Sequence, residues 1–263
     1  GDHRDLHLSI RRQRQMCIRD RLSVVATPIG NLEDITLRAL RTLREASIVA
    51  CEDTRNTKKL LMHFDIHTPT VSFHAHSGLI GFSKIIELLK EGKHVALVSD
   101  AGTPGISDPG LELVSVVREK LGSDVVIETI PGPSALAAAL AVAGMRAAHF
   151  TFYGFLPLKK GREKLIKEVV VSERASIFYE SPHRIVKLLN LLITFLEDGE
   201  GSGEQISDRR ASLASRRVGI FRELTKLHED TFVGSAREVL AYIESDRNKQ
   251  RGEFVVIVEG LAR

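Results

Sequence analysis

Tryptophan is absent from the 263-residue sequence, cysteine occurs only at Cys17 and Cys51, and aromatic residues make up 5% of the chain. Two cysteines are too few for a disulfide framework or a four-cysteine zinc site, which suits a reducing compartment, so we expect a cytoplasmic protein. Long hydrophobic runs are also missing, since the longest helical one, Leu136–Met145, is too short to cross a bilayer. We therefore expect no membrane span.

The charged residues are distributed unevenly. Residues 1–21 hold six of the 37 Lys and Arg residues and three of the 34 Asp and Glu residues, so the remaining chain has 31 of each sign. This first segment lacks the apolar core of a signal peptide, and we expect it to be an extension outside the fold. Because the body of the chain is electrically balanced, a surface that binds nucleic acid has to be a local basic patch.

The rest of the sequence alternates short β-branched runs with amphipathic helical segments, which is typical of a parallel sheet covered by helices. A helix of small residues over Ser134–Gly144, followed by a break at Leu156 and Pro157, indicates a domain boundary near residue 147. We therefore expect an α/β protein of two domains, 22–147 and 148–263. In the first domain, strands are predicted at Leu22–Ala26, Ser47–Cys51, Thr70–Phe73, His94–Ser99 and Asp124–Ile130.

The second half has the pattern of a mixed sheet. Residues 197–217 are rich in Gly, Ser, Glu and Arg and poor in apolar residues, so we expect a flexible surface insertion there. Strands are predicted at His149–Phe155, Ser176–Tyr179, Val218–Arg222 and Phe254–Val258, with a weaker one near Thr231, and helices at Arg162–Val170, Pro182–Leu196 and Ser235–Ser245.

Glycine and proline gather in the turns that follow the predicted strands of the first domain. In an open parallel sheet the ligand binds beyond the carboxyl ends of the strands, so these turns are expected to meet. Glycine lets the backbone approach a ligand closely, whereas an isolated turn of this kind is often only a turn. Five such turns on one edge favour a single site. They are Thr27–Asn31, Glu52–Arg55, His74–His76, Ser99–Gly110 and Pro131–Ala135.

The spacing of the glycines limits the ligand at this edge. Gly102, Gly105 and Gly110 do not fit the G-x-G-x-x-G pattern of dinucleotide-binding folds, and the chain has no G-K-[ST] phosphate loop. Both absences argue against nicotinamide and nucleoside triphosphate cofactors. A cofactor without phosphates, held largely by backbone atoms, remains compatible with the sequence.

Eight segments give the sequence a resemblance to a known family over nearly all of Leu22–Gly260. They are TPIGNLEDIT (27–36), EDTR (52–55), VSDAGTPGISDPG (98–110), PGPSA (131–135), GFLP (154–157), FYESPHR (178–184), RELTK (222–226) and GEFVVIVEG (252–260). In their joint order and spacing they resemble the ribosomal RNA small-subunit methyltransferase I family of the tetrapyrrole methylase superfamily. The resemblance implies two α/β domains with a cofactor cleft between them.

The resemblance also implies a reaction, a cofactor and partners. It implies methyl transfer from S-adenosyl-L-methionine to the 2′-hydroxyl of a cytidine in the decoding region of 16S rRNA, by a homodimer. By analogy, the residues around the cofactor would be Thr27, Pro28, Ile29, Gly30, Asp100, Ala101, Gly102, Thr103, Ser107, Pro131, Gly132, Pro133, Ser134 and Ala135. The chain departs from the family at Ser77 and Gly78, where members usually have an Asn-Glu pair, so no role is carried over to that turn.

Methyl transfer from a sulfonium needs the nucleophilic oxygen, the methyl carbon and the sulfur in line, so positioning supplies much of the acceleration. A carboxylate or imidazole near the ribose hydroxyl would help further, and the catalytic candidates are Asp100, Glu180 and His183. Each has a structural alternative. Asp100 could cap a turn or helix, and His183 could cap or pack against its helix.

The candidates for RNA contact are the basic residues Lys159, Lys160, Arg162 and Arg184. The first three equally suit an exposed helix start. In the 197–217 insertion, basic side chains either form a solvated charge run or contact phosphates; they are Arg209, Arg210, Arg216 and Arg217.

Two further groups have structural alternatives. His74 and His76 share one face of an extended segment, as metal ligands would, but no third ligand is near in the sequence, so we expect no metal. Glu52, Asp53 and Arg55 could form a local ion pair that holds a turn.

Two other functions remain open. One is C-methylation of a tetrapyrrole precursor with the same cofactor and fold, against which the RELTK and FYESPHR segments argue. The other is a non-catalytic RNA-binding protein with a decayed cofactor pocket, which would give no heat when titrated with the cofactor.

Overall fold

The computed structural model describes residues 20–73, 78–197, 213 and 215–261. The chain forms two compact units that divide between Ser134 and Ala135. This division precedes the boundary near residue 147 that the sequence suggests, because helix α6 (Ala135–Ala143) lies beside strand β10 (Phe254–Val258) of the second unit. Nearly all of the expected N-terminal extension and most of the 197–217 insertion lie outside the described residues.

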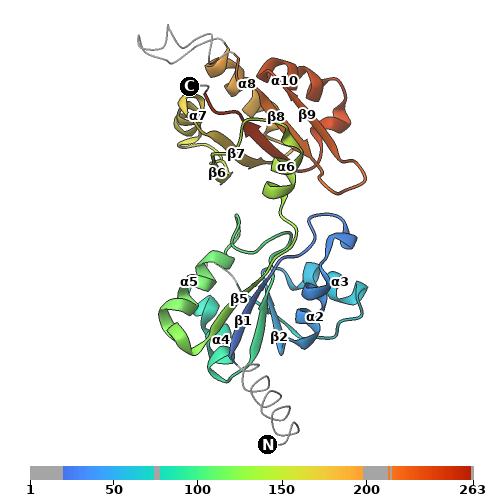
Figure 1. Ribbon diagram of the computed structural model, residues 1–263, viewed down its shortest axis with the longest axis vertical. Helices are drawn as coiled ribbons and strands as arrows, with labels where there is room; N and C mark the ends of the chain where they lie inside the picture. Colours follow the sequence, from blue (N-terminus) through green and yellow to red (C-terminus); the bar gives the residue numbers. More distant parts are fainter. Residues whose placement is uncertain (1–19, 74–77, 198–212, 214, 262–263) are drawn as a thin grey trace, which may run out of the picture. The chain divides into compact units, whose positions relative to one another are not determined.

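The first unit contains the expected parallel sheet (Figure 1). All of its neighbouring strands run parallel, in the order β3-β2-β4-β1-β5. The ends of the strands differ from the predicted ones by at most two residues; the strands are β1 (Arg21–Val25), β2 (Ile48–Cys51), β3 (Thr70–Ser72), β4 (His94–Leu97) and β5 (Val126–Ile130).

Helices cover both faces of this sheet. Alternate residues of each strand point to opposite faces, and both faces carry buried apolar side chains. On β4, Val95 and Leu97 pack with helices α4 and α5, whereas Ala96 packs with α2 and α3. The helices are α2 (Leu37–Glu45), α3 (Thr54–His63), α4 (Gly78–Lys90) and α5 (Gly110–Leu121), with short 3-10 turns η1 (Leu32–Asp34) and η3 (Gly122–Asp124).

Polar caps fix where two of these helices begin. The Thr36 side chain accepts a hydrogen bond from the Ala39 N–H at the start of α2, and Asp53 accepts one from the Arg55 N–H at the start of α3. Asp53 lies two residues after the end of β2, so the turn there is short, whereas longer segments separate β1 from α2 and β4 from α5 at the carboxyl edge of the sheet. We call this edge the first rim.

The second unit has the mixed sheet that the sequence predicts, in the order β6-β7-β10-β8-β9. β6 and β7 are parallel and the other neighbours are antiparallel. Helices α7, α8 and α10 pack on one face around Phe178, Ile220 and Val256. The remaining elements of the sheet and its helices are β6 (Phe150–Phe155), β7 (Ala175–Glu180), β8 (Val218–Arg222), β9 (Asp230–Gly234), α7 (Arg162–Val171), α8 (Ile185–Leu196), α10 (Ala236–Glu244) and the 3-10 turn η5 (Arg247–Gln250).

Three strands of this sheet end at one common edge. β10 is antiparallel to both β7 and β8, and Phe254 at its amino end pairs with Glu180 and with Arg222. β6 is parallel to β7. The segments after β6, β7 and β8 therefore lie at one edge, which we call the second rim. None of the helices in the described part of the chain is long and apolar enough to span a membrane.

Candidate functional site

The turns after β1 and β4 are joined at the first rim. The Thr27 N–H donates to the Gly102 carbonyl oxygen at 2.9 Å, and the Gly102 N–H donates to the Thr27 carbonyl oxygen at 3.1 Å. The Thr27 side chain is buried, and its hydroxyl donates to the carbonyl oxygen of Ser99 at 3.4 Å. These two turns flank the point where β4 and β1 lie side by side.

The turn after β5 is connected to the same place. The Thr103 hydroxyl donates to the Pro133 carbonyl oxygen at 3.0 Å. Gly102 has a φ of +80°, and a Cβ there would lie 3.2 Å from Cγ2 of Ile29, while a Cβ on Gly132 would lie 3.1 Å from the Ala26 Cβ. Glycine is needed where turns approach this closely. Three of the predicted turns therefore converge, as a single site requires.

Asp108 shapes the long turn after β4. Its carboxylate accepts hydrogen bonds from the Gly105 N–H at 2.9 Å and the Gly110 N–H at 2.7 Å, just before helix α5. Ser107 next to it has a φ of +66°, in the left-handed region. The two backbone contacts of Asp108 therefore hold both ends of the Gly105–Gly110 segment together.

Carboxylates gather beside these turns. Asp100 is exposed and accepts a 3.3 Å hydrogen bond from Nδ2 of Asn56, a residue that the sequence analysis did not single out. Burial, and then the nearby carboxylates of Asp108 and Asp100, raise the pKa of Glu52 above its ordinary value. The turn after β2 therefore shares one electrostatic environment with the turn after β4, and this environment favours a positively charged ligand.

Asp53 and Arg55 form the local ion pair that the sequence leaves as their alternative role. The Arg55 Nη2 lies 2.7 Å from Oδ2 of Asp53, and hydrogen bonds from Arg55 lower the pKa of Asp53 to about 2. Since Asp53 also caps α3, the pair holds the turn after β2.

The chemistry of the first rim fits a cofactor without phosphates. The three segments predicted to surround the cofactor, 27–30, 100–107 and 131–135, contain no Lys or Arg, although phosphate groups are usually bound by such cations. They offer glycine-lined backbone and nearby carboxylates instead. This combination suits a positively charged cofactor such as a sulfonium.

In the second unit, Glu180 lies in a buried ion-pair cluster. Only 1% of the residue is exposed, and its Oε2 lies 2.6 Å from Nη2 of Arg162, itself 4% exposed. Its other oxygen, Oε1, lies 2.8 Å from Nε of Arg184. Both carboxylate oxygens are thus engaged, which favours a positioning role for Glu180. Arg162 is not on the surface, so the structure removes it from the candidate RNA contacts.

Other predicted residues do face solvent at the second rim. Lys159, Lys160 and His183 are exposed, whereas Arg184 is partly buried and donates to the Leu156 carbonyl oxygen. The exposed Arg251 lies next to Gly252 and Glu253 at the same rim and was missed in the sequence analysis.

The last residues of the predicted insertion are anchored in the second unit. Arg216 is 2% exposed and donates to the carbonyl oxygens of Val169, Val170 and Glu259. Burial lowers the pKa of Arg216 to about 10. Arg217 Nη2 lies 2.8 Å from Oε1 of Glu259. Both arginines therefore stabilise the fold, and Arg209 and Arg210 lie outside the described residues.

The predicted histidine pair, His74 and His76, lies outside the described residues, as does Ser77. Within the described ranges, no three His, Cys, Asp or Glu side chains are grouped so that they could hold a metal ion.

Comparison with known proteins places this geometry in a family. The family model for tetrapyrrole (corrin/porphyrin) methylases matches residues 21–240. The chain is 41% identical over 240 residues to the ribosomal RNA small subunit methyltransferase I of Thermotoga maritima, covering 91% of this chain and 98% of the relative. Proteins of the same name from Escherichia coli O157:H7 and Bacillus subtilis are 41% and 42% identical, over 91% of this chain and 77% and 75% of their own lengths.

Solved structures share the fold at lower identity. The methyltransferase CobJ superposes with a TM-score of 0.62 at 19% identity, covering 91% of this chain and 93% of that chain. Uroporphyrin-III C-methyltransferase from Thermus thermophilus, solved in complex with S-adenosyl homocysteine, gives 0.57 at 17% identity over 91% and 96%. At such identities the likeness establishes the fold alone.

Proposed function

The chain belongs to the ribosomal RNA small subunit methyltransferase I family, and from this we propose that it methylates the 2′-hydroxyl of a cytidine in the decoding region of 16S rRNA. It is an S-adenosylmethionine-dependent methyltransferase of 16S rRNA. The observation that carries this conclusion is the identity of 41–42% over nine-tenths of the chain with relatives of that name. The choice of cytidine and of its 2′-hydroxyl rests on the family resemblance.

The cofactor site that we propose is the first rim. The Thr27–Gly102 backbone pair and the bond from Thr103 to Pro133 hold three turns together, so their N–H and C=O groups are pre-organised before any ligand binds. The lack of Lys and Arg in these turns and the nearby carboxylates support a cationic cofactor. When bound, S-adenosylmethionine supplies an electrophilic methyl group.

The chain's own residues would mainly position the ribose. Asp100 is exposed near the start of the turn after β4, two residues before Gly102, so its carboxylate can accept a hydrogen bond, or the proton, from the 2′-hydroxyl. Asn56 fixes one of its oxygens. His183 is the exposed alternative from the second unit, and Glu180 would act through Arg162 and Arg184.

The RNA would bind along the second rim, where Lys159 and Lys160 are exposed and suited to phosphate contacts.

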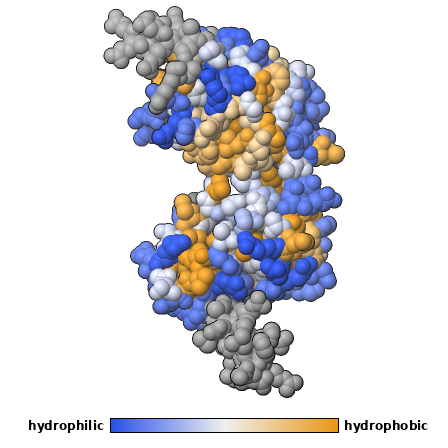
Figure 2. Space-filling view, in the orientation of Figure 1, coloured by the Kyte–Doolittle hydropathy of each residue, from blue (hydrophilic) through white to orange (hydrophobic). Residues whose placement is uncertain are grey.

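A homodimer is also part of the proposal. β6 is an edge strand of its sheet, and it exposes 40% of Phe150 and 55% of Phe155, among other apolar side chains visible on this unit in Figure 2. A ribosomal substrate implies the cytoplasm. Light scattering on the purified protein would test the dimer.

Labelled S-adenosylmethionine tests the proposed function directly. The protein is incubated with small ribosomal subunits, with naked 16S rRNA or with a tetrapyrrole precursor, and 2′-O-methylation is then mapped on the RNA. We expect label at one cytidine of the decoding region. Label in the tetrapyrrole alone would support the C-methyltransferase alternative, and absence of binding heat with the cofactor would support a non-catalytic protein.

A further inference from the structure

The turn between β8 and β9, residues 223–229, contains two non-glycine residues in the left-handed region. Glu223 has a φ of +49° and Thr225 a φ of +67°. A β-branched residue is rarely found in this conformation, because its side chain crowds the backbone. Such strain persists only where the surrounding structure enforces it.

Contacts on both sides of the turn enforce this conformation. The Glu223 N–H donates to the Glu253 carbonyl oxygen at 3.0 Å, and the Glu253 N–H donates to Oε1 of Glu223 at 2.9 Å. Lys226 Nζ joins the two carboxylates, at 2.9 Å from Glu223 and 3.0 Å from Glu253. Gly252 leaves the space that the Glu223 side chain occupies.

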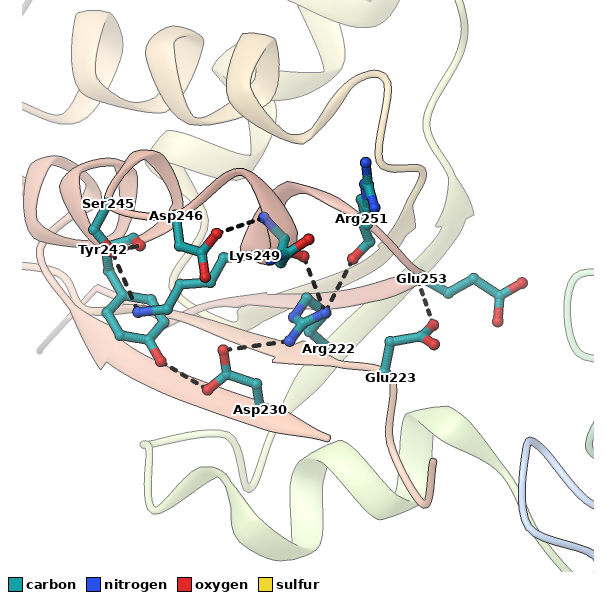
Figure 3. A network of polar contacts seen from close by, with 10 residues as sticks. Arg222, Glu223, Asp230, Tyr242, Ser245, Asp246, Lys249, Arg251 and Glu253 are labelled. Atoms are coloured by element: carbon teal, nitrogen blue, oxygen red, sulfur yellow. Dashed lines mark hydrogen bonds and ion pairs between the residues drawn. The ribbon is translucent and has the colours of Figure 1, made fainter. Parts of the chain in front are cut away.

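Arg222 extends this support to the neighbouring elements (Figure 3). It is 8% exposed, donates to the carbonyl oxygens of Asn248 and Arg251, and lies 3.7 Å from Asp230 of β9. Tyr242 of α10 donates a hydrogen bond to the same Asp230. The turn is therefore fixed to a strand, a helix and the η5–β10 connection.

Local stability does not explain a threonine at position 225. Its backbone conformation suits glycine better, and its hydroxyl is buried without a hydrogen-bond partner among the described residues. Thr225 thus has both an unfavourable backbone conformation and an unsatisfied buried hydroxyl, in a turn that its surroundings hold rigid. Such a combination indicates a functional constraint.

The apex of the turn is exposed. Leu227 is 93% exposed and His228 is exposed beside it. The turn follows β8 and so lies at the second rim, with the segments that carry Lys159 and His183. The charge of Lys226 is already neutralised by two carboxylates, so this turn does not suit phosphate binding.

We propose that Leu227 and His228 form a rigid contact for an unpaired nucleotide of the rRNA substrate, and that the strained 223–229 turn exists to hold them in place. The proposal rests on the function proposed above. Proteins read single-stranded RNA by packing side chains, histidine among them, against unstacked bases. A pre-organised turn loses less entropy on binding than a mobile one.

Relief of the strain separates a functional role from a structural one. In Thr225→Gly the glycine fits the left-handed conformation, so the melting temperature is expected to stay the same or rise. The turn becomes more flexible, so KM for the small subunit is expected to rise by about fivefold or more, with KM for S-adenosylmethionine unchanged. Asp65→Gly is the matched control, because Asp65 (φ +52°) lies in an exposed turn of the first unit, before β3.

Leu227→Ala and His228→Ala test the contact itself. Each is expected to weaken RNA binding without changing the dependence of the dissociation constant on salt concentration, because no phosphate contact is lost. A wild-type KM in Thr225→Gly, a parallel loss of melting temperature and activity, or a change in oligomeric state would overturn the proposal. If the wild-type protein does not methylate RNA at all, the proposed function fails instead.

Discussion

Oε2 of Glu180 lies 2.6 Å from Nη2 of Arg162, and both side chains are almost fully buried. Glu180 pairs with Arg162 and with Arg184, and both arginines donate hydrogen bonds to the segment that follows β6. Arg162 donates to the Pro157 carbonyl oxygen at 3.4 Å, and Arg184 donates to that of Leu156 at 3.3 Å. Lys159 and Lys160 follow this segment directly. The buried Glu180 carboxylate therefore fixes the backbone from which these two exposed lysines extend.

Removal of the Glu180 charge is expected to destabilise the second unit. In Glu180→Gln two arginines lose their anionic partner, one of them buried, and loss of one member of a buried ion pair costs about 3–5 kcal/mol. Urea unfolding followed by circular dichroism measures the loss. Glu163→Gln is the control, since Glu163 pairs with Lys167 at an exposed position and its loss costs about 1 kcal/mol or less. Equal stability of the two variants would show that the buried pair contributes little.

Gly102 tests whether the close approach of the turns matters for the cofactor. Gly102→Ala places a Cβ at a φ of +80°, 3.2 Å from Ile29, so we expect a loss of about 1–3 kcal/mol in stability. Displacement of the turn is also expected to weaken S-adenosylmethionine binding by about tenfold, measured by calorimetry.

Gly122→Ala provides the matched control for this substitution. Gly122 also has a positive φ, +51°, but no atom of the described residues lies within 4 Å of its Cβ position. Its replacement is expected to cost stability and to leave cofactor affinity unchanged. If both variants changed the affinity for S-adenosylmethionine equally, the proposal that the cofactor binds at the first rim would be wrong.

Asp100→Asn removes the carboxylate proposed to act on the ribose. Because Asp100 is exposed, the fold should tolerate the change, and kcat is expected to fall by about 10²-fold or more. If Asp100 contacts the cofactor instead, the dissociation constant of S-adenosylmethionine rises. Asp53→Asn, at the same rim but in a local ion pair, should keep nearly full activity. Full activity of the Asp100 variant would refute the assignment.

His94 is expected to make stability depend on pH. It lies at the amino end of β4, and its Nε2 lies 2.8 Å from the buried Ser23 hydroxyl. Burial, and then the charge of Arg21, lower the pKa of His94 below the ordinary 6.5. The unfolded chain therefore binds a proton that the folded chain does not, and stability decreases as pH falls below about 6.5. Urea midpoints between pH 8 and 5 should show this slope, and His94→Gln should flatten it. The same slope in both proteins would contradict the prediction.

The strands and the first rim could be predicted from the sequence, because their determinants are local. β-branched runs bounded by glycine and proline located each strand to within two residues, and parallel strands bring their carboxyl-end turns together. The predicted convergence of Thr27, Gly102 and Pro133 depends on no long-range information beyond that rule.

The roles of the buried charges could not be predicted, because the sequence does not show which charge meets which. Arg162 and Glu180 are 18 residues apart, and Arg216 reaches the end of α7, more than 40 residues earlier in the chain. From the sequence, Glu180 is a catalytic candidate and Arg162 a candidate RNA contact, because no local pattern shows that the two side chains pair in the core. For a related reason the division between the two units lies at Ser134, before the boundary near residue 147 that the sequence suggests. The contact of α6 with β10 is a tertiary contact, which the local sequence does not show.

Lys159 and Lys160 allow a test of the second rim that depends on charge alone. For single-stranded nucleic acid, each phosphate contact contributes about 0.7 to the slope of log binding constant against log salt concentration. The double variant Lys159→Gln/Lys160→Gln is therefore expected to reduce that slope by about 1.4. Lys58→Gln/Lys59→Gln removes the same charge from an exposed face of α3 and should leave the slope nearly unchanged. If the two double variants behave alike, the lysines act only through overall charge, and the RNA binds at another surface.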